Sequence, residues 1–132
     1  QSSTPSPVAN PLDGHLILCR KNAQNEDVLC EWNPHTRAQV ASIPILSNEL
    51  QRKVAGKYGV SVRAVDNVLT LAVGLHRSHG YTRPRVAALL DLLVQDNSEV
   101  LRVIAIWQWG YGSSGNPIQL QTIVGPPSGS DF

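Results

Sequence analysis

The sequence lacks methionine, has a single phenylalanine and two cysteines, and carries charge on only 16% of its 132 residues. Two cysteines are too few for a disulfide-dense secreted scaffold. No apolar run approaches the roughly 20 residues that cross a bilayer as a helix, so we expect no transmembrane segment. The start also lacks the basic and apolar regions of a signal peptide. Because the chain begins at Gln1 without any methionine, we expect a processed product or an excised fragment.

The composition is that of a folded domain. Its 42% of apolar residues are ordinary for a globular protein and exclude wholesale disorder. The length fits one domain. Both ends are rich in Pro, Gly or Ser and poor in large apolar residues. We therefore predict a flexible arm over residues 1–14, one domain over 15–124 and a flexible tail over 125–132.

Two strand-like runs near the start predict a β-hairpin. Residues 15–20 and 28–32 are rich in β-forming side chains, and a polar, Asn-rich turn separates them. In such a hairpin Cys19 and Cys30 lie nearly opposite each other. Two alternatives stay open for this pair, a cross-strand disulfide or two packed free thiols.

The middle of the chain has helix signals. Ser47 is a good N-cap for a helix over residues 48–57. A second helix is predicted from Ser61, with Val62, Val65, Val68, Leu69, Ala72 and Val73 at three- and four-residue spacing. Thr82 caps a third helix, which has Pro84 in its first turn and a stripe made by Val86, Leu89, Leu90 and Leu93.

The end of the chain returns to a strand pattern. Residues 100–109 and 118–124 are rich in Val, Ile and Trp, and a glycine-rich loop joins them, which predicts a second hairpin. The predicted fold class is α+β. It consists of a β-hairpin, a central bundle of about three helices that includes a helix-turn-helix-like pair, and a C-terminal β-hairpin.

Positive charge is concentrated in the middle of a chain whose formal net charge is only +1. Residues 51–85 contain seven Lys or Arg residues, and the single acidic residue among them is Asp66. A basic segment in a near-neutral chain indicates an anionic partner that is met at one face. The alternative is a solvated helix surface that only keeps the protein soluble.

Part of this basic segment has the spacing of two helices that cross at a tight turn. Ala55 provides the small residue where the helices meet, Gly59 tolerates the positive φ of the turn, and Val60 is the apolar residue after it. Val65 and Val68 occupy the buried positions of the second helix. Over about 20 residues, this pattern resembles the helix-turn-helix family of DNA-binding motifs.

The resemblance implies that a recognition helix begins at Ser61 and enters the major groove. Arg63 and Asn67 are then placed to read bases, and the neighbouring cations to contact phosphates. The predicted nucleic-acid-binding residues are Arg52, Lys53, Lys57, Ser61, Arg63, Asn67, Arg77, Arg83 and Arg85.

Other chemistry-bearing residues have weaker patterns. His76 and His79 have the spacing of two metal ligands on a helix, but no third ligand is near them in the sequence. The cysteines with His15 and His35 match no common zinc module. Asp91, Asp96 and Glu99 are interpreted as residues that solvate a helix end rather than as catalytic carboxylates. Trp107 and Trp109 are interpreted as core or subunit-contact residues rather than as a stacking platform. The glycine-rich loop 110–116 lacks the Lys-Ser/Thr of a phosphate-binding loop and is interpreted as a mobile hairpin tip.

The function predicted from the sequence is therefore a non-enzymatic nucleic-acid-binding domain for DNA or RNA, with no metal or cofactor and with homo-oligomerisation expected. The main alternative is a self-assembling structural protein, such as a virion coat or matrix subunit, or a secreted module. In that case the basic face meets a genome or an anionic membrane surface. A weaker alternative is a secreted enzyme or toxin.

Overall fold

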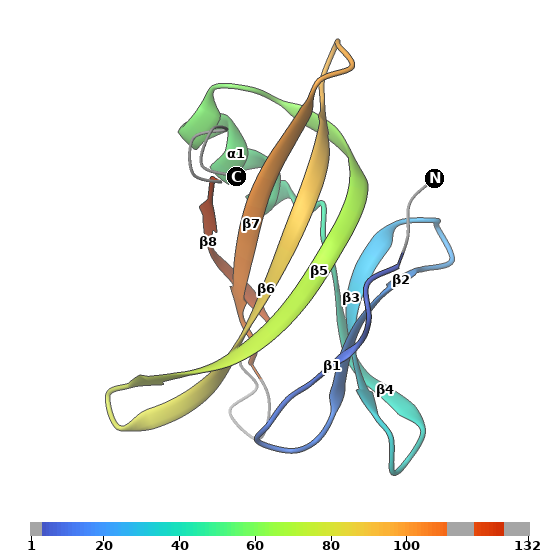
Figure 1. The fold of residues 1–132 in the computed structure, drawn as a ribbon, viewed down its shortest axis with the longest axis vertical. Coiled ribbons are helices and arrows are strands. Elements are labelled where there is room, and N and C mark those ends of the chain that lie inside the picture. The colour runs from blue at the N-terminus through green and yellow to red at the C-terminus, as the bar shows by residue number, and fades with distance from the viewer. Residues whose placement is uncertain (1–3, 111–117, 126–132) are drawn as a thin grey trace.

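Two antiparallel sheets of four strands, with one helix between them in the sequence, account for the described residues 4–110 and 118–125 of the computed structural model (Figure 1). Spatial order follows chain order in both sheets. The N-terminal sheet contains β1 (Val8–Ala9), β2 (Leu16–Lys21), β3 (Asp27–Asn33) and β4 (Ala38–Pro44). The C-terminal sheet contains β5 (Val62–Ser78), β6 (Tyr81–Val94), β7 (Val100–Gln108) and β8 (Gln119–Val124). The predicted α+β fold with a bundle of about three helices is therefore wrong.

The N-terminal hairpin predicted from the sequence is present as β2 and β3. Its turn is held by Asn22, whose Oδ1 accepts hydrogen bonds from the backbone N–H groups of Gln24 and Glu26, both at 2.9 Å. Asn25 takes a positive φ of 63° there, which asparagine tolerates better than most residues. β1 lies in the predicted arm and pairs with β2. The predicted tail from residue 126 and the loop 111–117 lie outside the described residues.

The first predicted helix is present as α1 (Asn48–Tyr58), and both of its ends form as the sequence indicates. Ser47 caps its start, because its Oγ accepts a hydrogen bond from the N–H of Leu50 at 3.1 Å. Gly59 ends it in the left-handed conformation, with φ 71°, and donates its N–H to the carbonyl of Ala55. Eleven residues make α1 too short to span a membrane, and no longer apolar helix occurs in the described ranges.

The second predicted helix is the strand β5, and β-bulges explain why its sequence has a helical period. The register of β5 against β6 shifts at three places along its first half. Each shift adds one residue, so the side chains facing the core recur every third residue rather than every second. Val62, Val65, Val68 and Leu71 thus pair with Val94, Leu92, Leu90 and Ala88, which recur at the ordinary spacing of two.

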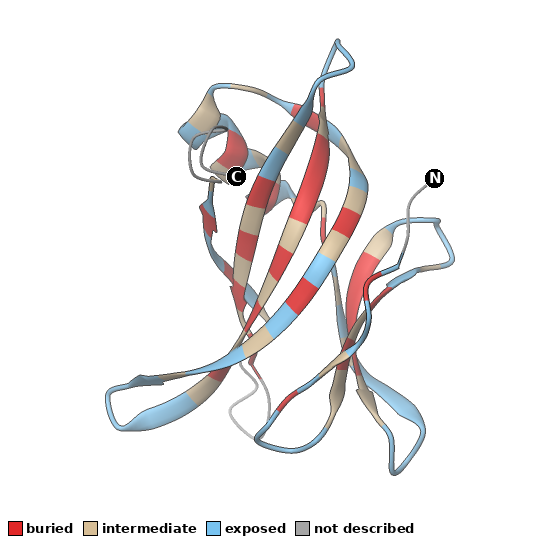
Figure 2. Cartoon of the chain, in the orientation of Figure 1, coloured by how far each residue is buried: buried red, intermediate tan, exposed pale blue. Residues whose placement is uncertain are grey.

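The third predicted helix is the strand β6, in which both faces are apolar. The residues from Val86 to Leu90 alternate between buried and half-buried along the strand, as the banding in Figure 2 shows. Because Ala87 and Leu89 on the outward face are as apolar as their inward neighbours, the alternation of a strand is absent from the sequence. Two leucines four residues apart, Leu89 and Leu93, then give the impression of a helical stripe.

The core lies where the inner faces of the two sheets and α1 meet. The N-terminal sheet contributes Ile17 and Leu29, and α1 contributes Leu50 and Val54, all fully buried. The largest core side chains are Trp107 and Trp109, which are 0% and 1% exposed. Both tryptophans belong to the core cluster. Since both are buried, they offer no external stacking platform.

Two glycines of α1 allow a matched test of this geometry. We expect Gly59→Ala to lower the free energy of unfolding by about 1 kcal/mol, because an L side chain is strained at positive φ. Gly56→Ala should raise it by about 0.5–1 kcal/mol, because position 56 is helical and open. Urea titration followed by tryptophan fluorescence measures both. Equal shifts of the same sign would contradict the assigned end of the helix.

Candidate functional site

The predicted nucleic-acid-binding residues do not form one surface, because the second helix of the expected motif does not exist. Residues after Gly59 enter β5, so the helix-turn-helix assignment is wrong. The 17 residues of β5 span roughly 50 Å. In Figure 1, α1 lies near one end of this strand and the β5–β6 turn at the other. The nine predicted residues therefore separate into three groups, on α1, at the start of β5 and around the β5–β6 turn.

In the group on α1, the cation of Lys57 already makes contacts within the protein. The Nζ of Lys57 donates a hydrogen bond to the carbonyl of Ile123 on β8 at 3.0 Å, and it lies 5.8 Å from the centre of the Tyr58 ring. Lys57 thus holds α1 against the C-terminal sheet. Arg52 is exposed and Lys53 is half-buried on the same helix.

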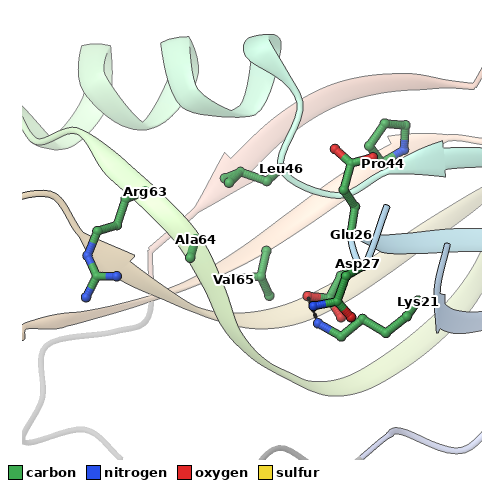
Figure 3. Close-up of a pocket in the computed structure, with 9 residues that line it drawn as sticks. Lys21, Glu26, Asp27, Pro44, Leu46, Arg63, Ala64 and Val65 are labelled. Carbon is green, nitrogen blue, oxygen red and sulfur yellow. Dashed lines mark hydrogen bonds and ion pairs between the residues drawn. The ribbon is translucent and has the colours of Figure 1, made fainter. Parts of the chain in front are cut away.

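The group at the start of β5 lies beside a hollow that is lined by charges of both signs. Ser61 precedes the strand and accepts a backbone hydrogen bond from Gln95 at 2.7 Å. Arg63 lines a hollow of about 230 Å³, in which Lys21 pairs with Asp27 at 3.2 Å and Glu26 adds a second carboxylate (Figure 3). The guanidinium of Arg63 points away from that ion pair (Figure 3). Two cations and two anions give this hollow no preference for a polyanion.

Asn67, the last residue of this group, lies on the outward face of the sheet opposite Asp91. Its Oδ1 is buried and receives no hydrogen bond in the described part of the chain. The Asp91 carboxylate is taken by Arg102, whose Nε and Nη2 donate to its two oxygens at 2.8 and 3.1 Å. This bond raises the pKa of Arg102 and leaves Asp91, a candidate acid or base in the sequence, as half of a structural ion pair.

The third group lies on a projecting two-stranded ribbon. β7 pairs with β6 as far as Arg85, and Trp109 adds one backbone hydrogen bond to Pro84, so among the described strands only β5 pairs with the part of β6 from Tyr81 to Arg83. In Figure 1 this ribbon extends at the lower left beyond the other strands of its sheet. His79 and Gly80 form its two-residue turn with φ of 52° and 81°, as tight hairpin turns of the primed type require.

A groove of about 540 Å³ opens on the outward face where this ribbon joins the sheet. Tyr81, Arg83 and Arg85 alternate along β6, so all three side chains lie on that face. The groove is lined by His76, Ser78 and His79 of the β5 side, by these three residues of β6, and by Gln108 of β7 and Gln121 of β8. The Nε2 of Gln121 donates to the Oε1 of Gln108 at 2.8 Å, which joins the two amides of β7 and β8.

The electrostatics of this groove are one-sided. From Asn67 to Leu90 the sequence has no Asp or Glu, and the next residue, Asp91, is neutralised by Arg102. The Nε of Arg85 is withdrawn from solvent and meets no acceptor among the described residues. A guanidinium N–H without an acceptor is costly, and an anionic ligand would supply one.

A buried polar cluster joins the two sheets, and the sequence-based prediction missed it. Glu31 of β3 is 1% exposed and accepts a hydrogen bond from the Nε1 of Trp109 at 2.8 Å. The Nδ1 of His15 lies 2.5 Å from the other oxygen of Glu31 and 3.5 Å from Asp13. The available signal was the strand alternation itself, because it places Glu31 on the same inward face as Leu29.

Asp13, His15 and Glu31 also form the one described group of three potential metal ligands, with all ligand atoms within 4.8 Å. The indole of Trp109 donates to one oxygen of Glu31, and the Nδ1 of His15 lies against the other oxygen, so both carboxylate oxygens and this ring nitrogen are already engaged within the protein. The cluster is therefore a structural link between the sheets.

The cysteines are free thiols. Cys19 lies opposite Leu29, whereas Cys30 lies opposite Leu18, so the two side chains point to opposite faces of the sheet. The alternative of a cross-strand disulfide is thereby removed, as is a common zinc site with the two nearby histidines. Burial raises the pKa of the Cys19 thiol to about 11, and Asp27 and Cys30 add smaller contributions in the same direction. Burial also raises the pKa of Cys30.

The chain matches no family model, no curated protein and no solved structure in the three comparisons.

The thiol environment predicts slow chemistry in the folded protein. A pKa near 11 leaves Cys19 almost entirely protonated at pH 8, and only the thiolate reacts with disulfide reagents. We expect both thiols to react with Ellman's reagent at least about tenfold more slowly in buffer than in 6 M guanidinium. A fast stoichiometric reaction of the folded protein would show that these side chains are accessible.

The inter-sheet cluster predicts a graded loss of stability. Glu31→Ala leaves the indole N–H of Trp109 without its acceptor and the Nδ1 of His15 without its partner, and should cost about 3 kcal/mol. Glu31→Gln retains an oxygen for Trp109 and should cost less. Asp13→Asn, at an exposed position, is the control and should cost under about 1 kcal/mol. Urea midpoints measure all three, and an unchanged midpoint for Glu31→Ala would refute the link.

Proposed function

We propose that this protein is a non-enzymatic nucleic-acid-binding protein, and that DNA or RNA lies in the groove on the outward face of the β5–β6 ribbon. One observation carries the proposal. Arg83 and Arg85 lie beside an exposed tyrosine in one groove, within a stretch of the chain that has no carboxylate. This placement replaces the helix-turn-helix surface that the sequence pattern indicated.

The side chains of the groove match the chemistry of a nucleic acid. Guanidinium groups form charge-assisted hydrogen bonds with phosphate oxygens. Hydroxyl and amide groups such as those of Ser78 and Gln108 commonly contact the sugar–phosphate backbone. An aromatic ring binds the face of any base, whatever its identity. All three kinds of group line one groove on one face of the C-terminal sheet, within reach of a single ligand.

The comparison with the other cations supports this choice of surface. Lys57 is bonded to the backbone of β8, and Arg63 lies beside carboxylates. Lys57 is thereby held against the C-terminal sheet, and a polyanion at Arg63 would also meet the carboxylates of Glu26 and Asp27. Arg52 and Lys53 carry the same formal charge as the groove pair but lie on α1, away from the groove residues. They provide a matched control of equal charge.

The proposal predicts that the double variant Arg83→Gln, Arg85→Gln binds a fluorescently labelled oligonucleotide at least about tenfold more weakly. The slope of log affinity against log salt should also fall by about one to two contacts, because each phosphate contact releases counterions. Fluorescence anisotropy over a salt series measures both quantities. The control Arg52→Gln, Lys53→Gln should change affinity by less than about threefold.

Two results would contradict the proposal. One is the absence of binding at low salt, and the other is an equal loss for the groove pair and the helix pair. Vesicles containing phosphatidylserine test the alternative anionic partner. Binding to these vesicles without binding to oligonucleotides would assign the groove to a membrane surface instead.

A further inference from the structure

We infer that the groove takes a single strand rather than a duplex, with one base stacked on the ring of Tyr81. This inference rests on the proposed function and specifies its ligand. It is drawn from the position of that ring, from its exposure and from the burial of the tryptophans.

Tyr81 is the most exposed large hydrophobic residue among the described residues, at 67%. It lies at the end of the ribbon, opposite Ser78 and directly after the His79–Gly80 turn. The turn needs no aromatic residue at this position, and no core residue packs over the ring in the described cluster. An aromatic ring left in water beside two arginines is a typical platform for a base.

The order of side chains along β6 suits an extended ligand. Positions two residues apart on a strand are about 7 Å apart, so the ring of Tyr81 is followed at that interval by Arg83 and then Arg85. A chain that alternates aromatic bases and charged phosphates can therefore meet the ring first and the two guanidiniums after it. The amides of Gln108 and Gln121 continue this path onto β7 and β8.

The ring discriminates between single strands and duplexes. In a duplex each base is covered on both faces by its neighbours, so only base edges and phosphates are accessible from the grooves. Tyr81 can then contribute no stacking. A single strand exposes base faces, and each face that stacks on an aromatic side chain adds to affinity with little regard to sequence. Trp107 and Trp109 cannot replace it, because they are buried between the sheets.

The test compares three variants at the ribbon in the full chain. Tyr81→Ala should weaken binding of a single-stranded oligonucleotide about tenfold, whereas Tyr81→Phe should stay within about twofold, because stacking needs the ring and not the hydroxyl. Leu75→Ala is the matched control. Leu75 is 48% exposed on the same ribbon but pairs with Pro84, which places it on the opposite face. It should also stay within about twofold.

Two further measurements complete the test. A single strand containing 2-aminopurine should change its fluorescence on binding to the unmodified protein, and this change should be lost with Tyr81→Ala. The same sequence as a duplex should bind at least about tenfold more weakly. Circular dichroism shows that each variant is folded.

The outcomes separate this inference from the function on which it rests. If no oligonucleotide of any kind binds, the proposed function fails. If oligonucleotides bind through the arginines but Tyr81→Ala has no effect, or duplex binds as well as single strand, only the assignment of a stacked single strand is overturned.

Discussion

The pairing register of β5 against β6 is the constraint on which the rest of this structure depends. A shift of one residue in a strand exchanges its inward and outward side chains. The bulges of β5 lie in its first half, so that half keeps valines on the core side while its partner runs without interruption. Beyond them the two strands are in regular register to the turn, which places Tyr81, Arg83 and Arg85 together on the outward face.

Local signals in the sequence predict the parts of the fold that are set locally. Ser47 and Gly59 define the ends of α1, and the Asn-rich turn defines the first hairpin. The strands β5 and β6 are set instead by partners far along the chain. Bulges gave β5 a period of three, and apolar side chains on both faces removed the period of β6. The spacing of Val62, Val65 and Val68 therefore indicated correctly which side chains face the core, but it predicted a helix where the chain forms a strand.

The candidate site, like the fold, could be predicted from the sequence only in part. The excess of positive charge over residues 51–85 predicted an anionic partner, and its members Arg83 and Arg85 line the groove. Which cations belong together could not be predicted, because charge counting along a chain assumes neighbours in sequence are neighbours in space. A strand of 17 residues separates them instead. Nothing in the sequence indicated the proposed stacking role of Tyr81, because that role depends on the position of the His79–Gly80 turn beside it.

Trp109 connects the projecting ribbon to both sheets. Its backbone N–H donates to the carbonyl of Pro84, at the root of the ribbon, at 3.0 Å. Its indole N–H donates to Glu31 of the opposite sheet at 2.8 Å. One buried residue therefore fixes the point from which the ribbon projects relative to both sheets. The proposed binding then has to order only the ends of the arginine side chains and the ring of Tyr81, and not the strands that carry them, which lowers the entropic cost of holding a flexible ligand.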